Sequence, residues 1–149
     1  MEPLYLEDLS IGQKFTSRPH TVDAEAIKAY AREFDPQLFH LDGEAAKKSL
    51  FGGLAASGWH TASLTMRLIV ESVPLAGGVI GSGGELSWPR PTKPGDTLRV
   101  VTEVLEITPS RSRPDRGTIV MRSTTLNQND EPVQVFTPKL VVQRRQAGA

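Results

Sequence analysis

The segment from Ser57 to Ser72 constrains the fold most, because it is predicted to be a helix that is apolar over most of its circumference. Ser57-Gly58 marks its start, and Pro74 lies just beyond its end. Its main apolar stripe is Trp59, Ala62, Met66, Ile69 and Val70, with Leu64 and Leu68 beside it. Its polar side chains form one narrow stripe of His60, Ser63, Arg67 and Glu71. Because such a helix must be buried, other elements have to wrap around it.

The second half of the chain supplies elements that can do this. Four β-rich runs, bounded by Pro, Gly, Asn and Asp turn signals, lie at 79–88, 97–107, 117–126 and 133–142. Residues 13–16 form a weaker strand, and Pro138 suggests an edge position or a bulge in the last run. The short connections favour antiparallel pairing. We therefore expect one α+β domain over 1–149 with a hot-dog fold, in which a curved antiparallel sheet of about five strands wraps a long central helix.

An earlier helix precedes the central one. Thr21 is the predicted N-cap, and Asp23 and Glu25 lie in the first turn, where the helix dipole favours acids. Apolar side chains then repeat at helical spacing, at Ile27, Tyr30, Ala31 and Phe34. Pro36 disfavours helical geometry at Asp35, so the helix should end there.

Composition excludes several classes of protein. The 17 basic and 17 acidic residues balance, and the one short basic stretch, Arg111 to Arg116, is too small to predict a nucleic-acid partner. The absence of cysteine rules out disulfides, zinc-thiolate sites and a thiol nucleophile. No apolar run approaches the about 20 residues of a membrane span, and Met1 to Ser10 lacks signal-peptide character, so we expect a cytoplasmic protein without a membrane partner. The polar tail from Arg144 to Ala149 is expected to fray.

Two short segments carry chemistry. The first places Asp35 and His40 five residues apart, in a stretch that Pro36 keeps out of helical geometry. The second is Ser57-Gly58, where the first N–H groups of the central helix lack helical partners and carry the positive end of its dipole. Each segment also has a purely structural interpretation, since Asp35 suits an Asp-Pro turn and Ser57 suits a helix N-cap.

Together these residues resemble the MaoC-like dehydratase family. The resemblance rests on Asp35, His40 and Asp42, on the turn ASGWHT into the central helix, and on the WPRPTKPGDTL stretch that begins at Trp88. It extends from about residue 9 to residue 142. The chain departs from the better-known hydratase motif, because Phe34 precedes the aspartate, Pro36 follows it directly, and asparagine is absent from the loop. Reaction type should therefore transfer better than the identity of the acyl group.

The resemblance implies an (R)-specific enoyl-CoA hydratase, or 3-hydroxyacyl-CoA dehydratase, that forms a homodimer or a higher homo-oligomer. Asp35 and His40 would share one water and supply the base and the acid. The Gly58 N–H would stabilise the thioester oxygen, and Ser57 would orient Asp35 or cap the helix. Arg111 and Arg113 are either a solvated hairpin tip or contacts for CoA phosphates. The CoA ester is the substrate, and no cofactor or metal is expected.

Two other functions remain open at this stage. A hot-dog acyl-CoA thioesterase would use the same thioester grip, but it resembles a different arrangement with a carboxylate on the central helix, where this chain has only Glu71 near the far end. A non-catalytic acyl-CoA-binding subunit is the second, and the intact Asp35 and His40 count against it. Asp42 is expected to cap a short helix over 43–49, His60 to be hydrogen-bonded inside the fold, and Trp88 to pack. Candidates for the acyl-pocket wall are Phe39, Leu50, Phe51, Leu54 and Leu75.

Overall fold

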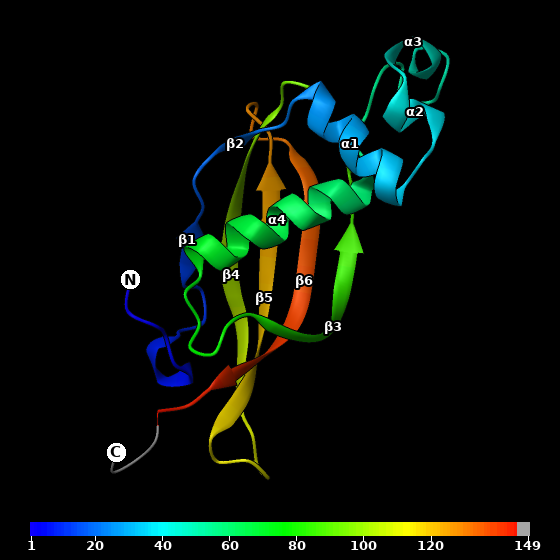
Figure 1. Ribbon diagram of the computed structural model, residues 1–149. Helices are drawn as coiled ribbons and strands as arrows, with labels where there is room; N and C mark the ends of the chain where they lie inside the picture. Colours follow the sequence, from blue (N-terminus) through cyan, green and yellow to red (C-terminus); the bar gives the residue numbers. More distant parts are fainter. Residues whose placement is uncertain (146–149) are drawn as a thin grey trace.

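The computed structural model describes residues 1–145 and shows a six-stranded antiparallel sheet with helices on one face (Figure 1). The strands are β1 Lys14–Thr16, β2 His20–Thr21, β3 Ile80–Ser87, β4 Thr97–Pro109, β5 Arg116–Leu126 and β6 Pro132–Gln143. The helices are α1 Ala24–Phe34, α2 Leu38–Leu41, α3 Gly43–Ala46 and α4 Gly58–Ser72, preceded by a 3₁₀ turn at Leu6–Asp8. This arrangement confirms the predicted α+β hot-dog architecture.

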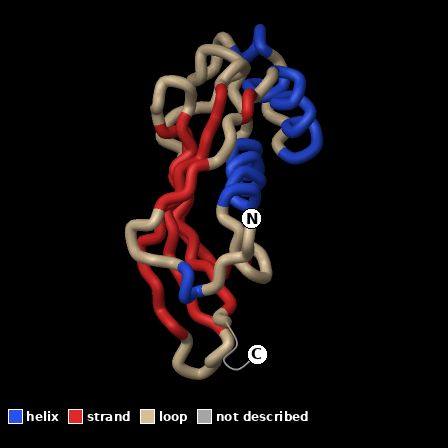
Figure 2. The backbone as a smooth tube through the Cα atoms, turned by 90° about the vertical axis from the view of Figure 1, so that its left-hand side faces the viewer, coloured by secondary structure: helices blue, strands red, loops and turns tan. Residues whose placement is uncertain are grey.

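The sheet has the order β1-β4-β5-β6-β3, with β2 added to the end of β4. Along most of β4 and β5, fully buried residues alternate with half-buried ones, because every second side chain points toward the helices. Figure 2 shows the sheet edge-on, with α4 against one side of it and α1, α2 and α3 gathered at one end. Seen from the front, α4 crosses β4, β5 and β6 (Figure 1).

Pro138 lies in an interior strand, so the expected edge position is wrong. β6 pairs with β5 on one side and with β3 on the other, where Pro138 is opposite Gly84. Pairing with β5 is interrupted between Phe136 and Lys139, where the proline has no N–H to donate. The expected irregularity is present next to it, as a bulge in β3 between Gly81 and Gly83.

The central helix is buried on one side only, which corrects the expectation that it is enclosed. Leu68 and Ile69 pack against Val100, Met121 and Leu140 of the sheet. Most of the predicted apolar stripe faces outward instead, with Trp59 at 57%, Met66 at 37% and Val70 at 54% exposure. The sheet-facing side includes threonines, and the Thr65 hydroxyl lies 2.6 Å from that of Thr125. A single layer of strands can cover only one side of a helix.

The chain ends and caps differ in detail from expectation. Asp23, not Thr21, caps α1 by accepting from the Ala26 N–H at 2.7 Å, because Thr21 belongs to β2. Asp42 caps α3 as predicted, but this helix ends at Ala46 and does not reach Ser49. Of the tail expected to fray, Arg145 forms an ion pair with Asp8 at 2.6 Å, and 146–149 lie outside the described residues.

Candidate active site

The segment between α1 and α2 brings the predicted pair together. Asp35 ends α1, and its backbone N–H still donates to the Ala31 carbonyl at 2.9 Å. After Pro36 the chain starts the single turn of α2, which turns the side chain of His40 back toward α1. The Nε2 atom of His40 lies 3.3 Å from Oδ2 of Asp35. The sequence spacing and the short α2 turn together account for this contact.

The surroundings of His40 define which nitrogen carries a proton. Nδ1 lies 2.6 Å from the backbone carbonyl of Ala55, which can only accept, so Nδ1 is the donor. Nε2 therefore carries the lone pair when the ring is neutral, and it donates to the Asp35 carboxylate that it faces when the ring is protonated. The ring is 4% exposed and packs edge-on against Phe39 at 4.6 Å. This packing holds Nε2 in one direction, as an acid–base group requires.

The carboxylate of Asp35 is kept ionised by its neighbours. Partial burial opposes the charged form, but the Ser57 hydroxyl, the Gln37 amide and the charge of His40 together lower its pKa below the ordinary value. The Gln37 amide donates to Oδ1 at 2.6 Å. The Ser57 hydroxyl also accepts from the Trp59 N–H at 3.2 Å and caps α4.

The start of α4 presents an unpaired donor. Within residues 1–145, the Gly58 N–H has no hydrogen-bond acceptor. The glycine is needed for a reason that the sequence did not suggest. A Cβ at position 58 would lie 2.7 Å from the Trp88 indole, so Trp88 covers this face of Gly58. Trp88 is held there by its own hydrogen bond to Gln134 at 2.9 Å.

Asp35, His40 and Gly58 line one cavity of about 420 Å³. The other lining residues come from the α1–α2 region, the start of α4 and the segment after β3: Gln37, Phe39, Phe51, Ala56, Trp59, Thr61, Trp88, Pro89, Arg90, Pro91 and Thr92. Of the predicted wall residues, Phe39 and Phe51 line it. Leu50 is fully exposed, and Leu54 and Leu75 pack in the hydrophobic cores.

Sequence reasoning did not assign a role to Gln37 or Arg90. Gln37 is adjacent to the Asp-Pro pair, so its position in the loop was a usable signal. Arg90 lies in the WPRPTKPGDTL stretch, but nothing in the local sequence indicates that this stretch folds against the start of α4.

Arg111 and Arg113 lie elsewhere in the same subunit. Both are exposed at the tip of the β4–β5 hairpin, at the opposite end of the sheet from α1 and α2 (Figure 1). The structure therefore does not bring them to the cavity that holds Asp35 and His40 within one chain. Among the described residues, no cluster of three or more His, Cys, Asp or Glu side chains could hold a metal ion.

His60 differs from expectation. It is 7% exposed and stacks on Tyr30 with ring centroids 4.8 Å apart. Its buried Nδ1 has no hydrogen-bond partner within the described part of the chain. Burial lowers the pKa of His60, which favours the neutral ring.

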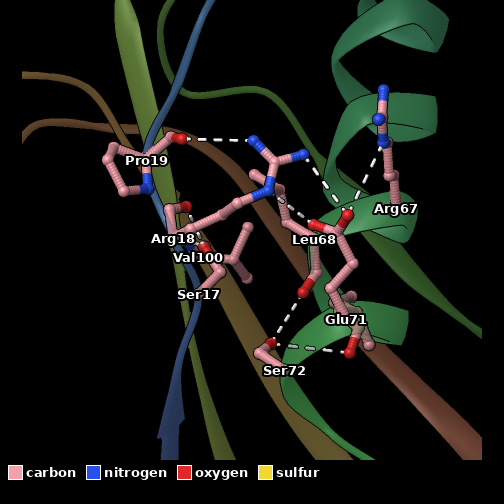
Figure 3. A network of polar contacts seen from close by, with 9 residues as sticks. Ser17, Arg18, Pro19, Arg67, Leu68, Glu71, Ser72 and Val100 are labelled. Carbon is pink, nitrogen blue, oxygen red and sulfur yellow. Dashed lines mark hydrogen bonds and ion pairs between the residues drawn. The ribbon is translucent and has the colours of Figure 1, made fainter.

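Glu71 is engaged at the far end of α4 (Figure 3). Arg18 Nε donates to its Oε1 at 2.9 Å, and Arg67 Nε lies 3.7 Å from its Oε2. The hydrogen bond from Arg18 lowers the pKa of this carboxyl. Glu71 therefore pairs with two arginines, and its bond to Arg18 links the N-terminal segment to α4. It does not line the cavity.

Comparison with known proteins agrees with this geometry. The family model for the MaoC-like domain matches residues 8–126. The chain belongs to the MaoC-like domain family.

Two solved structures and one curated relative of this MaoC-like chain are informative. A MaoC-like dehydratase from Rhodospirillum rubrum is 64% identical, with a TM-score of 0.94 over 96% of this chain and 99% of that one. An R-hydratase from Pseudomonas aeruginosa is 26% identical, with a TM-score of 0.77 over 96% and 88%. A 3-hydroxybutyryl-CoA dehydratase from Methylorubrum extorquens is 29% identical over 74% of this chain and 69% of its own length. The family thus includes hydro-lyases.

Proposed function

We propose that this protein is an enoyl-CoA hydratase, or 3-hydroxyacyl-CoA dehydratase, that adds water reversibly to a trans-2-enoyl thioester. The observation that carries the proposal is the Asp35–His40 pair, 3.3 Å apart, in the same cavity as the unpaired N–H of Gly58. The names of the relatives from Pseudomonas aeruginosa and Methylorubrum extorquens support the same class of reaction. The substrate is an acyl-CoA ester, and acid–base chemistry by these side chains needs no cofactor.

The proposed reaction uses one water held by the pair. The water oxygen bonds to C3 of the enoyl group while one of its protons passes to the pair. A proton passes from the pair to C2, so the C2=C3 π bond is replaced by C3–O and C2–H bonds and the pair ends as it began. Negative charge develops on the thioester oxygen during this addition, and the Gly58 N–H at the positive end of α4 stabilises it.

The stereochemical outcome tests this proposal. Asp35 and His40 come from one short segment, and the carbonyl is held separately by α4, so hydroxyl and proton should add to one face of the double bond. Resemblance to (R)-specific hydratases gives the handedness. We expect a straight-chain trans-2-enoyl-CoA to give one (R)-3-hydroxyacyl-CoA, measured by chiral chromatography. A racemic product, or rapid NADH formation with an (S)-specific 3-hydroxyacyl-CoA dehydrogenase, would contradict the proposal.

The alternatives are disfavoured by particular contacts. A thioesterase that used a central-helix carboxylate would need Glu71, which is bound to Arg18 outside the cavity. A non-catalytic subunit would have no need for the Gln37 and Ser57 donors that keep Asp35 ionised. Release of free CoA from an enoyl-CoA, measured with a thiol reagent, distinguishes thioester hydrolysis from hydration.

The Gln37 donor should extend activity to lower pH. A carboxyl whose pKa is lowered stays ionised as the pH falls, so kcat/KM should persist below the ordinary aspartate range. Gln37→Leu removes a donor to the ionised form, which raises the pKa of Asp35 and moves the acid limb of the kcat/KM profile to higher pH. Gln128→Leu is the matched control, because that amide donates to Asp96 at 3.0 Å. An unmoved acid limb in Gln37→Leu would show that Asp35 ionisation does not limit activity.

We also propose that the protein is a homodimer. The outward face of α4 exposes Trp59, Met66 and Val70, and β3 at the edge of the sheet has almost wholly exposed residues. An open edge beside an apolar helix face is a liability for a monomer, and a second copy can cover both. Light scattering should give about twice the 16.2 kDa chain mass, and Val70→Asp should shift the protein toward monomer. A wild-type monomer at micromolar concentration would refute the proposal.

No helix among the described residues is both long and apolar enough to cross a membrane. A cytoplasmic location and the lack of a nucleic-acid partner are expected from the sequence and are part of the proposal.

A further inference from the structure

We infer that Arg90 is a substrate-binding residue that pairs with an anionic group of the substrate, either a carboxylate on the acyl chain or a phosphate of CoA. The inference rests on the proposed function and extends it to the choice of substrate. Arg90 lines the same cavity as Asp35, His40 and Gly58.

The cavity has one permanent positive charge. Apart from Asp35 and the titratable His40, its described lining residues other than Arg90 are uncharged, and many are aromatic or proline. Such a lining suits an apolar chain, whereas a guanidinium with five N–H donors suits a carboxylate or a phosphate, which it can bind with two parallel hydrogen bonds. Arg90 can therefore bind an anionic group of the same ligand whose apolar chain contacts the rest of the cavity.

The wall that carries Arg90 is held in place. At Thr92, the carbonyl accepts from the Ala56 N–H at 2.8 Å, and the hydroxyl accepts from Thr61 at 3.0 Å. Upstream, Trp88 packs on Gly58 and donates to Gln134. Pro89 and Pro91 restrict the backbone on both sides of Arg90. The segment is thus tied to the start of α4, which carries the proposed oxyanion donor.

Glu131 positions the guanidinium without using all of its donors. Its Oε2 lies 3.1 Å from Nη1 of Arg90, while its Oε1 accepts from the Asn127 amide at 3.1 Å. Asn127 is itself buried in the β5–β6 turn and accepts from the Glu131 N–H at 3.1 Å. The Arg90 side chain remains 55% exposed. The carboxylate therefore orients Arg90 from one side and leaves its other donors open to a ligand.

Binding of unreactive saturated thioesters tests the inference independently of turnover. Trp59 and Trp88 line the cavity, so their fluorescence can report the Kd of a bound thioester. The reference ligand is butyryl-CoA. Succinyl-CoA adds a carboxylate to the acyl chain, and butyryl-pantetheine lacks the phosphates of CoA. If Arg90 binds phosphate, Arg90→Ala should weaken butyryl-CoA about tenfold or more and leave butyryl-pantetheine unchanged. If it binds the acyl carboxylate, Arg90→Ala should remove a preference of about tenfold or more for succinyl-CoA over butyryl-CoA.

Arg122→Ala is the matched control, because Arg122 is a similarly exposed arginine that pairs with Glu103 at 3.5 Å away from the cavity. Arg90→Lys keeps the positive charge but loses the bidentate guanidinium, so it should bind the ligand better than Arg90→Ala and less well than the wild type. An equal loss for all three ligands in Arg90→Ala, a loss no larger than in Arg122→Ala, or no binding by the wild type would overturn the inference. Selective binding that needs Arg90, in a protein that hydrates no enoyl-CoA, would sustain this inference and refute the proposed function.

Discussion

Asp35→Asn and His40→Gln should each lower kcat on the true enoyl-CoA substrate by about 10²-fold or more while the protein stays folded. The asparagine would keep the shape of the Asp35 side chain but lose the negative charge that Ser57 and Gln37 stabilise. The glutamine in place of His40 could still donate to the Ala55 carbonyl, which Nδ1 now contacts at 2.6 Å, but it cannot accept or release a proton. The measurements are steady-state hydration rates, with circular dichroism to verify folding.

Matched controls separate loss of chemistry from general damage. Asp42→Asn makes the same substitution at the α3 cap, where asparagine caps equally well, and should keep near-normal kcat. His20→Gln is the control for His40→Gln, because it makes the same histidine-to-glutamine change in β2, outside the cavity. It should also keep near-normal kcat. If Asp35→Asn or His40→Gln retained near-normal kcat, the assignment of the pair would be wrong.

Gly58→Ala should destabilise the protein and also reduce its activity. The added methyl would lie 2.7 Å from the Trp88 indole, which is held by Gln134 and cannot move freely. Overpacking of this kind costs about 1–3 kcal/mol, and displacement of Trp88 would disturb the wall that includes Arg90. Thermal and denaturant unfolding report the stability, and kcat/KM reports the site.

The matched control is Gly53→Ala, since a Cβ at Gly53 meets nothing within 4 Å. Trp88→Leu in combination with Gly58→Ala should give a smaller loss than the two single effects added together, because the shortened side chain removes the clash. Equal unfolding midpoints for wild type and Gly58→Ala would show that Trp88 does not set the requirement for glycine.

Local sequence patterns predicted most of the secondary structure. The four strong β-runs became β3 to β6, and the segment after Ser57 became α4, because alternation, helical spacing and turn residues act over short stretches of chain. The exposed face of α4 was misjudged. Apolar periodicity located Trp59, Met66 and Val70 on one stripe, but it could not tell whether that stripe would meet the sheet of its own chain or remain outward.

The same division holds at the candidate site. The sequence by itself determined that Asp35 and His40 lie in one short segment and that Ser57 and Gly58 start a helix, since each of these depends on neighbours a few residues away. Tertiary structure alone decided that the Ala55 carbonyl selects the histidine tautomer, that Trp88 covers Gly58, and that Arg90 lines the cavity. These contacts join segments 15 or more residues apart, and their geometry depends on how the whole sheet packs against α4.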